Sequence, residues 1–96
     1  MAKIPIRTGT RLSLVYRDID TNERISTVGE VIDVSKPGGE VQEMTIEEED
    51  SERTIYVDHR TIEGHGVTLE THQEVYEVTD EGKNQIGSIE SFGAVS

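Results

Sequence analysis

Several residue types that often determine a protein's chemistry are absent or rare in this chain of 96 residues. It contains no cysteine and no tryptophan, and its other aromatic residues are three tyrosines and one phenylalanine. The absence of cysteine excludes disulfide bonds, thiolate nucleophiles and cysteine-ligated zinc. No window approaches the roughly 18 apolar residues of a membrane-spanning helix, and no apolar stretch follows Lys3, as it would in a secretory leader. We therefore expect a cytoplasmic protein without a membrane partner.

Positive charge is also scarce. The sequence has twenty Asp and Glu residues against nine Lys and Arg, of which three are Lys, and its formal charge at pH 7 is −11. Repulsion among these charges destabilises a compact chain in dilute buffer. Salt near 1 M screens it, because the Debye length falls to about 3 Å. The excess of Glu, the shortage of Lys and the preference for Val and Thr over Leu resemble the composition of haloarchaeal proteins. This resemblance implies a halophilic, archaeal protein.

The apolar residues that are present favour strands. Ten Val, ten Ile and ten Thr stand against three Leu, and β-branched side chains pack well on the pleated surface of a sheet. They recur with a period of two in short runs that are bounded by Gly, Pro, Asn and Asp. This pattern indicates one ordered β domain rather than a disordered acidic chain. No segment carries a helical apolar stripe.

The clearest predicted strand covers residues 11–18, where Leu12, Leu14 and Tyr16 point to one side. Residues 61–66, by contrast, are predicted to form a loop or a single helical turn. Further strands are predicted at residues 24–34, 41–48, 53–59, 67–71 and 74–79. The side chains expected to face inward from the third and fourth of these six strands are Met44, Ile46, Ile55 and Val57.

The predicted second strand changes its inward-facing set along its length. Ile25 belongs to one alternation, whereas Val28, Ile32 and Val34 belong to the other. Gly29 lies near this change. A β-bulge or sharp bend at this point would curl a small sheet into a barrel.

These patterns predict an all-β fold: a small, strongly bent antiparallel barrel of five to six strands. Residues 1–10 are expected to form an N-terminal arm, residues 11–79 the barrel, and residues 80–96 a partly ordered C-terminal extension. Residues 36–39 are expected to make a tight connection. The apolar residues of the extension that could form a last strand or pack onto the barrel are Ile86, Ile89 and Phe92.

The order of the strands resembles that of small barrels of the Sm-like or Src-homology-3-like kind, in which a bent, glycine-bearing second strand follows the first. The segments that carry this resemblance are residues 12–16, 28–34, 44–46 and 55–58. The uridine-binding loops of Sm proteins are not matched, so neither a base pocket nor ring assembly is implied. The glycine-containing hairpin at residues 29–34 and 39–41 is also similar to the PRC-barrel family. That similarity implies a role in protein interaction or as an adaptor.

Charge is distributed unevenly along the chain. Residues 1–36 have a net charge of +1 and residues 37–96 a net charge of −12, and the first seventeen residues contain four bases and no acid. A guanidinium group pairs two phosphate oxygens at once, so this end is the candidate contact with RNA or DNA. The predicted nucleic-acid-binding residues are Arg7, Arg11, Arg17, Arg24 and Lys36, with Tyr16 available to stack on a base.

Two alternatives compete with this interpretation. The arginines could instead neutralise Glu43, Glu47 and Asp33 on neighbouring strands. The chain could also be a protein–protein adaptor that pairs through an exposed sheet edge. The sequence leaves the oligomeric state open.

Nothing in the sequence indicates catalysis. His59, His65 and His72 lie six and seven residues apart on different predicted elements, without the spacing of a zinc-protease motif. No serine lies in a nucleophile turn, and no glycine-rich loop has the lysine of a phosphate-binding motif. We therefore predict a binding module that is not an enzyme and that holds neither a metal nor a cofactor.

Overall fold

The computed structural model describes residues 6–35 and 42–95. These residues form eight strands and contain no helix that is long and apolar enough to cross a membrane. The predicted connection at residues 36–39 lies outside the described residues. The strands are β1 (Arg11–Asp18), β2 (Arg24–Ser35), β3 (Glu43–Glu48), β4 (Thr54–Asp58), β5 (Thr61–Gly64), β6 (Val67–Thr71), β7 (Glu74–Thr79) and β8 (Gly82–Ala94).

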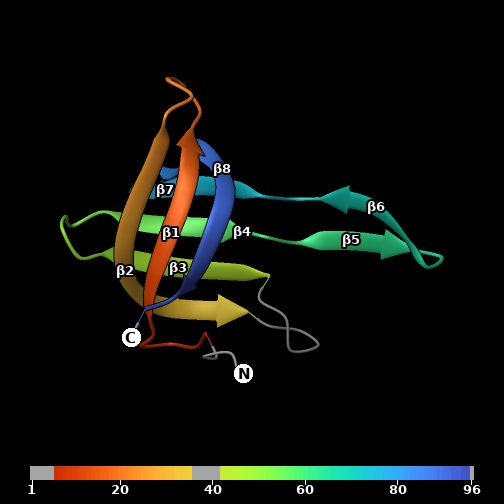
Figure 1. The fold of residues 1–96 in the computed structure, drawn as a ribbon, viewed down its shortest axis with the longest axis horizontal. Coiled ribbons are helices and arrows are strands. Elements are labelled where there is room, and N and C mark those ends of the chain that lie inside the picture. Colours follow the sequence, from red (N-terminus) through yellow and green to blue (C-terminus); the bar gives the residue numbers. More distant parts are fainter. Residues whose placement is uncertain (1–5, 36–41, 96) are drawn as a thin grey trace.

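Six of the strands form a closed barrel in the order β1-β2-β3-β4-β7-β8, in which every pair of neighbours is antiparallel. The other two, β5 and β6, form a separate two-stranded sheet that extends away from the barrel (Figure 1). The predicted all-β barrel of five to six antiparallel strands is thus confirmed. Closure pairs β8 with β1, so the barrel has no free edge strand.

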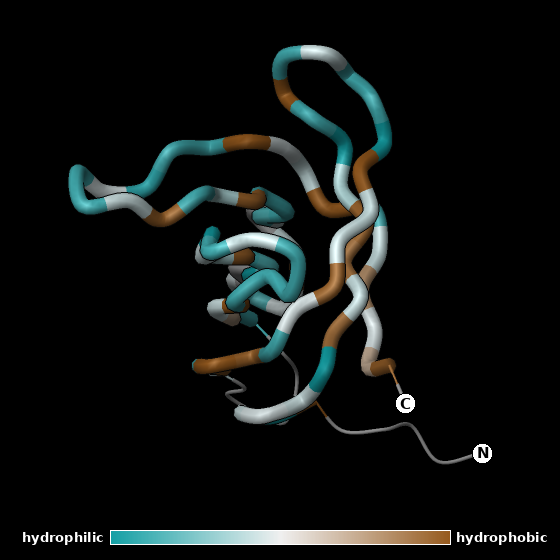
Figure 2. Tube along the Cα trace, turned by 90° about the vertical axis from the view of Figure 1, so that its left-hand side faces the viewer, coloured by the Kyte–Doolittle hydropathy of each residue, from teal (hydrophilic) through white to brown (hydrophobic). Residues whose placement is uncertain are grey.

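The core is built by the alternation that the sequence predicts. Hydrophobic and hydrophilic residues follow one another along the strands (Figure 2), and the inward set of β1, β3 and β4 is fully buried, as expected. Burial of these side chains from water is the main free energy that holds the strands together. The buried apolar residues are Leu12, Leu14, Tyr16, Val31, Met44, Ile46, Ile55, Val57 and Val75.

The second strand changes parity as predicted, but at a different residue. β2 pairs first with β1 and then with β3, and its register with β3 shifts between Val31 and Asp33. The intervening Ile32 is 38% exposed, whereas Val31 is fully buried. The prediction that Val28 and Ile32 face inward is therefore wrong. Val28 lies opposite Ser13, which alternates with the inward Leu12 and Leu14, and Ile32 follows the buried Val31, so the bulge changes the parity only after Ile32.

Gly29 serves close approach between strands instead of forming the bulge. A Cβ atom at this position would meet the backbone oxygen of Glu47 and would lie 2.5 Å from Cγ2 of Ile46. Gly87 on β8 has the same role, since a Cβ there would meet the backbone oxygen of Arg17 and lie 2.7 Å from Cδ2 of Tyr16. Two glycines thus let the wall of the barrel bend tightly.

The segment expected to be a C-terminal extension is an integral part of the barrel. β8 pairs with β7 on one side and with β1 on the other. Both registers contain a shift, and these irregularities interrupt the period of two that would have revealed a strand. Ile86, Ile89 and Phe92, spaced three residues apart, pack against the core from this irregular strand. The expected barrel of residues 11–79 therefore lacks the strand that closes it.

Residues 61–71 form a hairpin, which we call the arm. The expected loop or helical turn at residues 61–66 is wrong: β5 occupies its first part, and a two-residue turn follows in which His65 and Gly66 have φ values of 55° and 77°. Positive φ at both positions is the type I′ geometry of tight hairpins. The strand predicted at residues 67–71 is present as β6, but it pairs with β5 and not with a strand of the barrel.

Substitution of the glycine at a strand contact tests the close approach of β8 to β1. We expect Gly87→Ala to lower the free energy of unfolding by about 1–3 kcal/mol, because the added methyl group overpacks a backbone oxygen and the Tyr16 ring. Gly93→Ala, on the same strand with no atom within 4 Å of its added Cβ, is the matched control. Thermal unfolding followed by circular dichroism in about 1 M KCl measures both; equal midpoints for the two variants would contradict the close contact.

Candidate functional site

The arginines predicted to bind nucleic acid are engaged in ion pairs. Arg11 donates hydrogen bonds from Nε and Nη2 to the carboxylate of Glu49, at 2.5 and 3.1 Å. These bonds, more than the charge of Arg11, hold the pKa of Glu49 below its usual value. Arg11 therefore presents an ion pair with Glu49 to solvent rather than a bare guanidinium group.

Arg17 and Arg24 share a single carboxylate, that of Glu90 on β8. Nη2 of Arg17 lies 2.8 Å from Oε1, and Nε of Arg24 lies 2.7 Å from Oε2. Arg17 also donates to the backbone oxygen of Asn22 at 2.9 Å. The hydrogen bond from Arg17 is the main cause that lowers the pKa of Glu90. Pairing within the chain, the alternative weighed above, is thus present, although with other acidic residues than Glu43, Glu47 and Asp33.

The remaining predicted residues do not form a site with these arginines. Tyr16 is 1% exposed and belongs to the core, so its predicted role in base stacking is wrong. Arg7 is exposed in the segment before β1. Lys36 lies outside the described residues. Of the predicted residues that the structure describes, it brings Arg17 and Arg24 together, and it does so around the carboxylate of Glu90.

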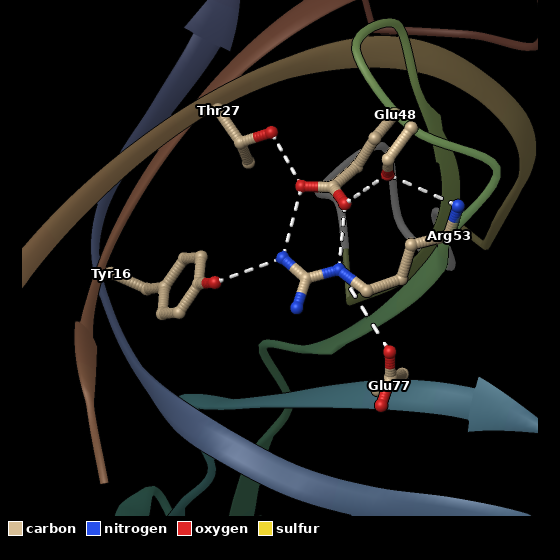
Figure 3. A network of polar contacts seen from close by, with 6 residues as sticks. Tyr16, Thr27, Glu48, Arg53 and Glu77 are labelled. Carbon is tan, nitrogen blue, oxygen red and sulfur yellow. Dashed lines mark hydrogen bonds and ion pairs between the residues drawn. The ribbon is translucent and has the colours of Figure 1, made fainter. Parts of the chain in front are cut away.

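The hydroxyl of Tyr16 belongs to a polar network centred on Glu48 and Arg53 (Figure 3). Arg53 donates to both oxygens of Glu48, at 2.6 and 3.1 Å, and to Tyr16 at 3.2 Å. The hydroxyls of Thr27 and Ser51 donate to the same carboxylate, at 2.6 and 2.9 Å. With both oxygens of Glu48 occupied by donors, the network is a structural element of the barrel and leaves no open ligand position on this carboxylate.

A second polar cluster lies where the arm joins the barrel. Asp58 ends β4, and its register partners are Glu43 on β3 and Glu74 on β7, so three carboxylates lie in a row across adjacent strands. Like charges directly opposite one another destabilise a sheet unless a cation compensates them. Arg60 supplies one: its Nε and Nη2 each lie 2.8 Å from an oxygen of Asp58, and Nε lies 3.4 Å from Oε1 of Glu43.

Asp58 is the one buried charged side chain among the described residues, at 4% exposure. Burial is the largest single effect on its pKa and raises it, but the hydrogen bonds and charge of Arg60 outweigh burial and hold the pKa below its usual value. Asp58 therefore stays ionised at neutral pH.

His72 completes this cluster from the segment between β6 and β7. Its Nδ1 lies 3.1 Å from Oε1 of Glu74, and its backbone N–H donates to the backbone oxygen of Arg60 at 2.7 Å. Asp58, His72 and Glu74 each offer a ligand atom, and these atoms lie within 4.8 Å of one another. They are the one group of three potential metal ligands found in the described part of the chain.

The other two histidines lie in different surroundings. The ring of His59 packs edge-on against Phe92, with 5.3 Å between centroids. His65 lies exposed in the turn of the arm. Of the three histidines, His72 lies in the cluster, and its partner Glu74 was not among the candidate residues of the sequence. The spacing of two residues between His72 and Glu74 can be read from the sequence. The approach of Asp58 to these two residues depends on the register between β4 and β7.

Two tyrosines pack together on the outside of β4 and β7. The rings of Tyr56 and Tyr76 are 5.9 Å apart, and Nζ of Lys83 lies 3.7 Å from the centroid of Tyr56. Burial, helped by neighbouring Glu43, raises the pKa of Tyr56 to about 12. The face of this ring is thus occupied by a cation of the chain itself.

Both strands of the arm have an unpaired edge along their whole length, whereas the barrel strands have one only over part of their length, as at the end of β2, which pairs with β3 alone. β5 and β6 pair with each other, so one side of each strand has no partner strand among the described residues. Val67, at the start of β6, is 60% exposed. The arm projects well beyond the barrel wall (Figure 1), which leaves these edges accessible.

Comparison with known proteins adds no assignment. No protein family, curated protein or solved structure matches this chain.

The network around Glu48 makes stability dependent on pH. The hydrogen bond from Arg53 is the main cause that holds the pKa of Glu48 below the usual value of a glutamate, about 4.5. Its contribution is therefore present above about pH 4.5 and is lost as the pH falls through the lower folded pKa. We expect Glu48→Gln to cost about 1–3 kcal/mol of unfolding free energy at pH 7.

The difference between wild type and Glu48→Gln should shrink as the pH falls below about 4.5, where the wild-type carboxyl group becomes neutral as well. Urea unfolding at a series of pH values measures it. Glu52→Gln, which removes an exposed carboxylate from the same hairpin, is the control and should have little effect. A difference that stays constant down to acid pH would show that the ion pair is not its source.

Proposed function

We propose that this chain is a non-catalytic binding module whose arm, β5 and β6, pairs with an extended, basic segment of a partner protein. The observation that carries the proposal is the two-stranded sheet that stands outside a closed barrel. A two-stranded hairpin is only marginally stable by itself in water. A third strand added to it would satisfy the unpaired backbone groups along one edge and would extend the sheet.

The closed barrel directs this form of binding to the arm. Each barrel strand has two neighbours in the closed order, and the arm is inserted between β4 and β7, which are adjacent. Strand addition along the whole of a barrel strand would require an existing pair to open, although the end of β2 after Glu30 pairs with β3 alone. Addition to the arm breaks no pair, which makes it the favoured edge for the adaptor role that the sequence left as an alternative.

Charge indicates what kind of segment the arm would bind. Residues 61–79, which contain the arm and β7, include four Glu and no Lys or Arg. A segment of this composition attracts a strand that carries Lys and Arg side chains. It repels a second copy of this chain, whose formal charge is −11. A basic partner is therefore favoured over self-association.

The nucleic-acid interpretation has weaker support. Arg11, Arg17 and Arg24 each have a carboxylate partner, and a phosphate group would have to displace it. Their neighbours Glu49 and Glu90 would then lie unpaired beside the phosphate. This repulsion, with Tyr16 in the core, places nucleic acid second.

Selection from a peptide library tests the arm. We expect peptides selected against the wild-type chain to be extended and rich in Lys and Arg. They should bind Thr68→Lys at least tenfold more weakly, or about 1.4 kcal/mol, because a lysine on β6 repels a basic strand. Ser91→Lys adds the same charge at an exposed position of β8 and should bind normally. The measurement is fluorescence anisotropy in the lowest salt that keeps the fold.

Two outcomes would contradict the proposal. One is a set of selected peptides that bind Thr68→Lys and Ser91→Lys equally. The other is saturable binding of labelled single-stranded RNA or duplex DNA by the folded chain in about 1 M KCl, where non-specific phosphate contacts are weak. Loss of that binding in the variant with Arg11→Glu and Arg17→Glu would restore the predicted nucleic-acid site.

A further inference from the structure

We propose that Asp58, His72 and Glu74 bind a divalent transition-metal cation of the zinc type at the base of the arm. The ligand atoms of these residues lie within 4.8 Å of one another. The inference does not depend on a peptide partner for the arm, because its test measures binding of the cation alone.

The donor set suits zinc or a related ion. One imidazole nitrogen and two carboxylate oxygens are ligands that zinc accepts at about 2.0–2.2 Å, with a water molecule in the fourth position of a tetrahedron. Donor atoms around such an ion lie about 3.4 Å apart, so the distances between the three ligand atoms need to shorten by roughly 1 Å. His72 and Glu74 are partly exposed and can make this movement, whereas Asp58 is held by the barrel.

One carboxylate oxygen in the cluster lacks a partner. Oε2 of Glu74 is buried and accepts no hydrogen bond from the described residues. A buried acceptor without a donor costs free energy, and more so when it is charged. A cation between Glu74 and Asp58 would compensate this oxygen directly.

The local charge also favours a dication. Glu43, Asp58 and Glu74 carry three negative charges in a row across β3, β4 and β7. Arg60 contributes one positive charge, which leaves two negative charges when His72 is neutral, the form of imidazole that binds metals. A divalent ion would balance the cluster.

Arg60 must coexist with the ion, since it already donates to both oxygens of Asp58. Oδ1 also accepts from the backbone N–H of Arg60 at 3.3 Å, whereas Oδ2 accepts, among the described residues, from Nη2 alone and has a second lone pair that a metal ion can use. The side chain of Arg60 is 43% exposed and also contacts Glu43 at 3.4 Å, toward which it can shift. Arg60 therefore weakens the site without closing it.

The arm is connected to the barrel by two chain segments, one that follows β4 and one that precedes β7 (Figure 1). An ion at this position would join the end of β4 to the segment between β6 and the start of β7. The ion would thus fix the base of the arm.

Titration with Zn²⁺ alone tests the site. We expect isothermal titration calorimetry in about 1 M KCl, which suppresses loose binding to exposed carboxylates, to show one ion bound per chain. His72→Gln and Glu74→Gln should each weaken binding at least tenfold. Glu81→Gln removes an exposed carboxylate from the β7–β8 turn and should leave the affinity unchanged. Circular dichroism in the same buffer verifies that each variant is folded.

A second measurement uses the wild-type chain, so it does not depend on the folding of a variant. On addition of Zn²⁺, the imidazole resonances of His72 should shift in the NMR spectrum, and those of His59 and His65 should not. Three results would overturn the proposal. They are no saturable binding of Zn²⁺ by the folded wild type, an affinity of folded His72→Gln and Glu74→Gln equal to that of the wild type, or an NMR shift confined to His59 or His65.

Discussion

Pairing of β8 with β1 is the constraint on which the rest of this structure depends. It closes the sheet, so each strand of the barrel has two neighbours and the inward side chains of β1 become fully buried. The approach is close enough that Gly87 lies against the Arg17 backbone and the Tyr16 ring. Closure thus flanks each barrel strand on both sides over part of its length. Both strands of the arm, by contrast, have one side without a partner strand along their whole length.

The same pairing determines what the arginines do. Because β8 lies beside β1, Glu90 reaches Arg17 and Arg24, while Glu49 at the β3–β4 hairpin reaches Arg11. Exposed pairs of this kind contribute little to stability, because water and salt screen the charges. Their larger effect is on the charge of the surface, since they remove bare positive charge from a chain that has little of it. Glu48 differs, because it is nearly buried and all its donors come from the barrel and its hairpins.

The base of the arm is where fold and proposed chemistry meet. Register places Glu43, Asp58 and Glu74 side by side, an arrangement that a sheet tolerates only with compensating cations. Arg60 compensates the charge of Asp58, and His72 lies next to Glu74. The two proposals share this region but depend on different groups: strand addition on backbone edges, cation binding on side-chain donors.

Local pattern alone determined the fold class, the inward faces of β1, β3 and β4, and the existence of a bend in β2, because alternation of side chains is a property of neighbouring residues. The irregular registers of β8 and the bulge at Ile32 broke that alternation, so the closing strand and the site of the bend could not be located from it. Which acid pairs with which arginine, and whether Asp58 meets His72, depends on strands that are distant in the sequence. Only tertiary pairing decides such contacts, since register between strands is fixed by the packing of the whole barrel.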